Sequence, residues 1–173
     1  MRILIVAAPR TGSSELCSRL SRYLNLSMYQ EPFHPTRNML LSGKAISYNL
    51  EDNAVVKCLI LQVPKGYDEL KPVEFYEEYA KNFDKVILLL RKDVVAQIKS
   101  FSFMIAQKGT GFRGDKPYTY TEQDNYEEAK NGILLYNELV KNLGIRLGIP
   151  PIFLEDLYGD DKGPLKQDKK QTI

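Results

Sequence analysis

Residues 2–20 read RILIVAAPRTGSSELCSRL, an apolar and β-rich run that passes through a short polar turn into a stretch with helical spacing. Arg2 to Ala7 is continuously apolar after its first residue, which predicts a buried strand. From Ser13 to Leu24 the apolar side chains recur every three or four positions, which predicts an amphipathic helix. The chain therefore begins with a strand, a tight loop and a helix.

The rest of the chain repeats this alternation. Predicted strands cover 54–61, 86–90 and 152–154, and predicted helices cover 72–80, 94–105 and 122–143. Asp93 is placed to cap the helix that follows it. The stretches 30–53 and 107–120 are polar or rich in glycine and proline, so we expect loops there.

Strands that alternate with helices favour parallel pairing through crossover connections. We therefore expect one α/β domain over residues 1–173, of the P-loop type, with three α/β/α layers around a central, mostly parallel sheet. The lysine-rich tail 160–173 is expected to be a solvated terminus. Ligands of such sheets bind beyond the carboxyl ends of the strands, so the loops after Ala7, Leu61 and Leu90 are expected to meet.

Length and composition exclude several classes of protein. A chain of 173 residues, 43% of them hydrophobic, suits one buried core. With 24 Lys and Arg against 22 Asp and Glu, no strong field draws the whole molecule onto nucleic acid or a membrane. No apolar run approaches the ~20 residues of a membrane span, and no signal-peptide pattern is present, so we expect a cytoplasmic protein. Cys17 and Cys58 are expected to be buried thiols, neither disulfide-bonded nor bound to a metal.

The first loop has the setting of an anion site. Residues 8–14 lie between a buried strand and a helix start, where backbone N–H groups and the helix dipole favour a phosphate. Compared with the Walker A spacing, Ala7 and Gly12 occupy the glycine positions and Ser13 stands where the lysine belongs. The cation lies inside the loop instead, at Arg10, so this is not an ordinary ATP loop.

A second cation follows the strand 86–90. P-loop NTPases commonly have an aspartate there to hold magnesium, whereas this chain has Arg91. A guanidinium at this point favours direct bidentate contact with a second phosphate. Ser100, on the following helix, is placed to add a hydroxyl donor to the same phosphate. An ion pair of Arg91 with Asp93 or Glu155 is the alternative structural interpretation.

The chain resembles the sulfotransferase superfamily in three segments, taken in order: Pro9 to Ser14, Arg91 with Ser100, and Phe153 to Tyr158. The resemblance implies an enzyme that uses 3'-phosphoadenosine 5'-phosphosulfate without a metal and releases adenosine 3',5'-bisphosphate. It further implies that Arg91 and Ser100 bind the 3'-phosphate, and that the 5'-phosphosulfate lies on a loop formed by Pro9, Arg10, Thr11, Gly12, Ser13 and Ser14.

The segment from Pro9 to Phe33 looks most like bacterial carbohydrate sulfotransferases of the trehalose type, where a glutamate and an aromatic follow the first helix. Here that pattern is Glu31-Pro32-Phe33, which implies Glu31 as the base that takes the acceptor's hydroxyl proton. His34 is a competing candidate for the base.

Lys57 looks like the strand lysine that cytosolic sulfotransferases have before a catalytic histidine, but no histidine follows it here. We therefore expect catalysis by Arg10, Glu31 and Lys57, with Lys57 stabilising charge on the transferring group. The alternative for Lys57 is a strand-end lysine whose ammonium extends to solvent.

The expected partner is a small hydroxyl-bearing acceptor, with no nucleic acid and no membrane. A carbohydrate acceptor is suggested by the resemblance around Glu31. Two alternatives use the same scaffold. One is a P-loop nucleotide kinase or NTPase, which requires ATP and magnesium. The other is a shortened, non-catalytic relative that binds the nucleotide only.

Overall fold

A computed structural model of the chain describes residues 1–34, 52–64, 71–108 and 125–158. Its strands and helices alternate, and their bounds are β1 (Arg2–Ala7), α1 (Ser13–Leu24), β2 (Ser27–Gln30), β3 (Ala54–Leu59), α3 (Pro72–Ala80), β4 (Lys85–Leu90), α4 (Val94–Lys108), α5 (Tyr126–Leu147), β5 (Ile152–Phe153) and α6 (Leu154–Tyr158).

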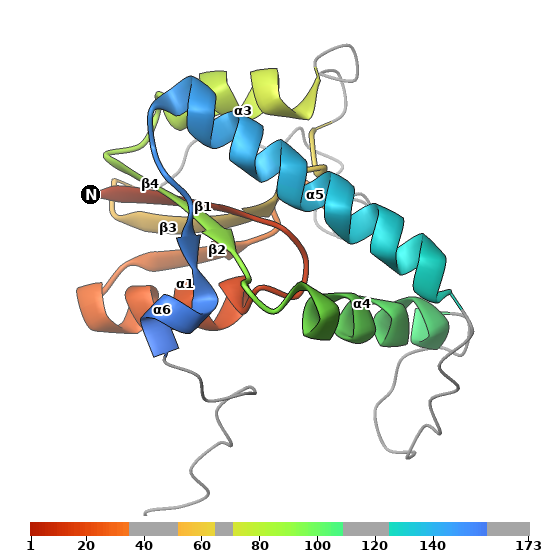
Figure 1. Cartoon of the computed structure of the whole chain (residues 1–173). Coiled ribbons are helices and arrows are strands. Elements are labelled where there is room, and N and C mark those ends of the chain that lie inside the picture. Colours follow the sequence, from red (N-terminus) through yellow and green to blue (C-terminus); the bar gives the residue numbers. More distant parts are fainter. Residues whose placement is uncertain (35–51, 65–70, 109–124, 159–173) are drawn as a thin grey trace, which may run out of the picture.

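The described strands form one sheet in the order β2-β3-β1-β4-β5. Every pairing between neighbours is parallel, so all carboxyl ends lie at the same edge. Helix α1 covers one face of this sheet, and α3 and α5 cover the other (Figure 1). This arrangement confirms the predicted α/β class with three layers.

The core explains why β1 is apolar throughout. Leu4 and Val6 belong to the cluster formed with α3 and α5, whereas Ile3 and Ile5 belong to the cluster formed with α1. All four side chains are almost completely buried. A strand that is covered on both faces needs apolar residues at every position, and β1 at the centre of the sheet meets this condition.

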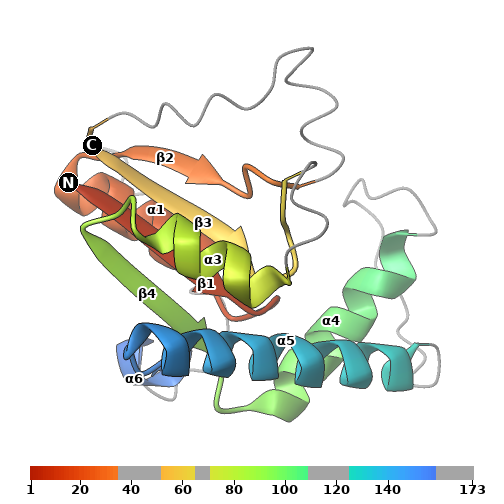
Figure 2. The same cartoon turned by 90° about the horizontal axis from the view of Figure 1, so that it is seen from above.

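Helix α4 lies outside the two helical layers that cover the sheet. It leaves the carboxyl end of β4 and crosses α5, as the two views show (Figures 1 and 2). Ile98 of α4 packs there with Ala129 and Ile133 of α5 in a separate buried cluster. Asp93 caps α4 as predicted, because its carboxylate Oδ1 accepts a hydrogen bond of 2.9 Å from the N–H of Ala96.

Several predicted bounds are wrong at element ends. The strand predicted over 54–61 ends at Leu59, because Ile60 and Leu61 form a turn closed by a bond from the N–H of Gln62 to the carbonyl of Leu59. The helix α4 continues through residues 107 and 108, which belong to the predicted loop. The rest of that loop lies outside the described residues, as do the tail and the start predicted for the helix 122–143.

Two elements have no predicted counterpart. The edge strand β2 carries no strand signal, because its residues SMYQ are half exposed and lack an apolar run. The strand predicted over 152–154 includes Leu154, which instead begins the short helix α6. Within the described ranges, no helix combines the length and the apolar character that a membrane crossing requires.

Candidate functional site

The turn between β1 and α1 has an unusual backbone. Arg10 and Gly12 both adopt left-handed conformations, with φ of 62° and 71°. The buried hydroxyl of Thr11 donates a hydrogen bond of 2.8 Å to the carbonyl of Ala8, which closes the turn. Gly12 is the N-cap of α1 and has no side chain to accept from the first helical N–H groups. A cradle of backbone donors is thus placed at the positive end of the helix dipole.

Helix α4 contacts the Arg10 side chain. The Nε of Arg10 donates a hydrogen bond of 2.7 Å to the Oγ of Ser100, across 90 residues of sequence. Partial burial of the guanidinium lowers the pKa of Arg10, and the neighbouring positive charge of Arg91 lowers it further. Arg10, Ser100 and Arg91 are therefore brought together at the carboxyl ends of β1 and β4.

Arg91 faces a carboxylate on α6. Its Nε lies 3.6 Å from the Oε1 of Glu155, in an ion pair whose two side chains are 19% and 18% exposed. This is one of the two ion pairs in the alternative interpretation of Arg91. The contact is too long for a hydrogen bond, and the buried Nε has no hydrogen-bond partner among the described residues. The Nε of Arg91 is thus a buried donor that lies beside the Glu155 carboxylate.

Glu155 also holds the start of α4. Its carboxylate accepts hydrogen bonds of 2.9 Å and 3.1 Å from the N–H groups of Lys92 and Asp93. Partial burial by itself raises the pKa of Glu155, but these backbone donors and the Arg91 guanidinium outweigh that effect and hold the pKa below its ordinary value. Glu155 consequently stays ionised and fixes the position of Arg91 relative to β5 and α6.

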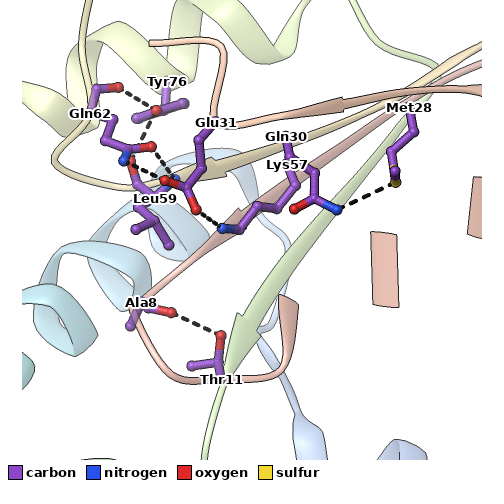
Figure 3. A network of polar contacts seen from close by, with 9 residues as sticks. All are labelled: Ala8, Thr11, Met28, Gln30, Glu31, Lys57, Leu59, Gln62 and Tyr76. Carbon is purple, nitrogen blue, oxygen red and sulfur yellow. Dashed lines mark hydrogen bonds and ion pairs between the residues drawn. The ribbon is translucent and has the colours of Figure 1, made fainter. Parts of the chain in front are cut away.

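Glu31 and Lys57 form a second cluster, in which Glu31 follows the end of β2 and Lys57 lies within the neighbouring strand β3 (Figure 3). The Nζ of Lys57 donates to the Oε1 of Glu31 in a close ion pair. The side chain of Lys57 is only 3% exposed and that of Glu31 is 17% exposed. The alternative of a solvent-reaching lysine is therefore wrong, because the ammonium is buried against a carboxylate.

Gln62 completes this cluster, although it is not among the residues predicted for the site. Its Nε2 donates a hydrogen bond of 3.0 Å to the Oε2 of Glu31. The hydroxyl of the buried Tyr76 lies within hydrogen-bond distance of the carbonyls of Leu59 and Gln62, which holds this turn against α3 (Figure 3). No pattern in the sequence marks Gln62, because its role depends on a turn that brings it back to β2.

His34 lies close to Glu31 in the chain. Its N–H donates a hydrogen bond of 3.0 Å to the carbonyl of Glu31, in a turn where Glu31 itself has a left-handed φ of 52°. The N–H of Glu31 in turn donates to the carbonyl of Lys57. Both candidate bases therefore belong to one turn after β2.

The two clusters are linked through the sheet. The N–H of Ile60, just after β3, donates a hydrogen bond of 3.1 Å to the carbonyl of Ala7 at the end of β1. The charge of Lys57 also acts on Cys17 in the second turn of α1. Burial raises the pKa of Cys17 to about 11, and the Lys57 charge opposes this rise. Along β3, Lys57 alternates with Val56 and Cys58, which pack against α3 and α5, so the Lys57 side chain leaves the sheet on the α1 face.

The remaining predicted residues of the loop line the same turn. Ser13 is almost completely buried, Ser14 is exposed in the first turn of α1, and Pro9 is buried. A shallow surface hollow over α1 lies apart from these residues and is lined by Leu16, Arg19, Leu20, Arg22 and Tyr23. Within the described parts of the chain, no three His, Cys, Asp or Glu side chains gather as a metal site requires.

Comparison with known proteins adds no family assignment. No protein-family model matches the chain, and no curated protein matches it closely enough to indicate kinship.

Proposed function

We propose that this chain binds 3'-phosphoadenosine 5'-phosphosulfate and transfers its sulfuryl group to a hydroxyl of a small acceptor. One observation carries the proposal. Three groups expected to bind the donor, Arg10, Arg91 and Ser100, come from separate parts of the sequence and meet at the carboxyl ends of β1 and β4. This is the edge at which ligands of parallel sheets bind.

The charge at this edge suits an anion with several phosphate oxygens. Two guanidinium groups close enough to repel each other gain most from a ligand of opposite charge. Ser100 and the N–H groups of the turn add neutral donors, which favour an anion without adding further repulsion. We assign the 3'-phosphate to Arg91 and Ser100, and the 5'-phosphosulfate to Arg10 and the backbone of residues 11–14.

The Glu31 cluster supplies the chemistry of transfer in this proposal. The acceptor oxygen attacks sulfur, the bond between sulfur and the bridging phosphate oxygen breaks, and the hydroxyl proton passes to Glu31. A base must begin ionised, and the buried Lys57 ammonium stabilises the ionised carboxylate. Lys57 is then placed beside the transferring group as negative charge develops there. In-line geometry and charge stabilisation carry the reaction.

A binding protein without turnover is the second candidate. The ion pair between Glu31 and Lys57 favours it specifically, because each of the two expected catalytic groups is satisfied by the other. A nucleotide kinase or NTPase stays a prediction to be tested alongside, although Arg91 stands where such proteins hold magnesium. A carbohydrate acceptor and a cytoplasmic location also remain part of the proposal.

Calorimetry distinguishes these candidates. We expect adenosine 3',5'-bisphosphate to bind in the presence of a chelator, and ATP with magnesium to bind at least about tenfold more weakly. Tight binding of ATP that depends on magnesium would instead identify the kinase. Transfer of labelled sulfuryl from the donor to a panel of hydroxyl compounds then separates the enzyme from the binding protein.

A further inference from the structure

A buried pair of amides joins α4, α5 and the turn after β1. Gln97 of α4 is completely buried, and Asn137 of α5 is 7% exposed. The Nε2 of Gln97 donates a hydrogen bond of 2.8 Å to the carbonyl of Pro9 and lies 3.4 Å from the Oδ1 of Asn137. The Nδ2 of Asn137 donates back to the Oε1 of Gln97 at 3.2 Å.

Burial of two amides is costly unless each polar atom has a partner. A side chain such as methionine would fill the same volume between α4 and α5 and would need no hydrogen bonds. Packing of the two helices therefore does not explain why position 97 is a glutamine. The hydrogen bond to the Pro9 carbonyl, 88 residues away in the sequence, does explain it.

The bond to Pro9 sets the direction of the next N–H group. In a planar trans peptide, the C=O and the following N–H point in opposite directions. Because the Pro9 carbonyl points inward to Gln97, the N–H of Arg10 points away from that buried pair. Arg10 also has a left-handed φ, which is strained for a residue with a side chain and needs support from its surroundings.

Gln97 and Ser100 lie three residues apart, on neighbouring positions of one helix face. Gln97 fixes the backbone before Arg10, while Ser100 accepts from the Arg10 side chain. A single helix therefore orients both the peptide and the guanidinium of the same arginine.

We infer that Gln97 is a positioning residue for the anion-binding turn, whereas Asn137 only provides a hydrogen-bond partner for the other end of the Gln97 amide. This inference rests on the proposed function, because it assigns a role at the same donor site. Neither residue touches the donor in this arrangement. The effect of Gln97 reaches the ligand through the Pro9–Arg10 peptide.

The test compares Gln97→Met with Asn137→Leu by calorimetry with adenosine 3',5'-bisphosphate. Gln97→Met removes the bond to Pro9 and should weaken binding about tenfold or more. Asn137→Leu is the matched control, since it breaks the same amide pair but leaves the Pro9 bond in place. It should weaken binding clearly less, although both variants lower the melting temperature.

The outcomes are separable. If wild-type protein binds and Gln97→Met binds equally well, the positioning role is overturned while the proposed function stands. If both variants weaken binding by the same factor, the amide pair is only structural and the inference fails. If wild-type protein does not bind the nucleotide, the proposed function and this inference fail together.

A further measurement keeps the inference testable if Gln97→Met does not fold. A crystal structure of wild-type protein with adenosine 3',5'-bisphosphate should retain the Gln97 contact, with the Arg10 N–H directed at a phosphate. An Arg10 N–H directed away from the ligand would overturn the assignment.

Discussion

Arg10 combines two unfavourable features that an anion would relieve. Its left-handed backbone costs about 1–2 kcal/mol for a residue with a side chain. Its guanidinium is held by Ser100 near the like charge of Arg91. A structural residue at the turn would need neither feature, so Arg10 is the residue on which the proposed donor site most depends.

Arg10→Ala should therefore weaken binding of adenosine 3',5'-bisphosphate and lower sulfuryl transfer by about a hundredfold or more, because it removes a cation that contacts the transition state. Ser100→Ala retains the guanidinium and removes only a neutral hydrogen-bond partner, so it should cost only a few-fold. Calorimetry and transfer of labelled sulfuryl measure the two effects. Near-normal turnover of Arg10→Ala would contradict the role of Arg10.

Glu31 and His34 compete for the role of base, and substitution separates them. Glu31→Gln keeps the shape of the side chain but cannot take a proton, so we expect about a hundredfold loss in transfer with unchanged nucleotide binding. His34→Asn should have little effect. The opposite pattern, measured in the same transfer assay, would assign the base to His34.

The Lys57 pair makes a separate prediction about stability. Lys57→Met leaves the carboxylate of Glu31 partly buried without its counter-ion, which should lower the free energy of unfolding by about 2 kcal/mol or more. The double variant Glu31→Gln with Lys57→Met removes both charges and should recover part of this loss. Urea unfolding measures the free energy of unfolding of each variant. Equal stability of the single and double variants would show that the two charges do not interact.

Among the elements, α1 and α6 meet at Gly12. Its φ is 71°, and a Cβ at this position would lie 2.7 Å from the Cδ1 of Leu154. Gly148, which ends α5, has a similar φ of 66°, but a Cβ there would have no described atom within 4 Å. Substitution at Gly148 therefore tests backbone strain alone, whereas substitution at Gly12 adds a steric clash with α6.

Gly148→Ala should lower the free energy of unfolding by about 1 kcal/mol, through backbone strain alone, and leave nucleotide binding unchanged. Gly12→Ala adds displacement of Leu154 and of the turn, so it should be more destabilising and should weaken binding of adenosine 3',5'-bisphosphate. Urea unfolding and calorimetry on both variants test this. Equal effects of the two substitutions on both measurements would contradict the contact between the turn and α6.

For the molecule as a whole, the buried thiols link stability to pH. Both cysteines are buried and free of disulfides. Burial raises the pKa of Cys17 from 9.0 to about 11 and that of Cys58 to about 12. The folded chain therefore keeps these protons to higher pH than the unfolded chain does. Below about pH 9 both states are protonated and the thiols have no effect on the pH dependence.

Between about pH 9 and the folded pKa values, the unfolded state loses these protons first, so stability falls as the pH rises. The loss approaches about 1.4 kcal/mol per thiol for each pH unit. Replacing Cys17 and Cys58 by alanine should lower stability at pH 8 through the lost packing but flatten its decline toward pH 10. Urea unfolding across this range measures the slope, and parallel slopes would contradict the assignment.

Local patterns in the sequence are enough to establish the alternation of strands and helices and the arginine-bearing turn after the first strand. The bounds of α1 and α3 follow from helical apolar periodicity, and those of β1 follow from an unbroken apolar run, since a strand covered on both faces is apolar throughout. The arginines at 10 and 91 can be recognised because each follows a buried strand closely.

Which polar groups meet depends on the tertiary arrangement. Gln97 and Asn137 occupy buried positions of their helices, which signals an unusual residue but not that the Pro9 carbonyl is the partner. The sequence leaves a solvent-exposed Lys57 open as an alternative, because nothing local shows that β2 lies beside β3 and brings Glu31 to its ammonium. Periodicity records which face of an element is buried, whereas the sheet order and the crossovers determine the neighbours of that face.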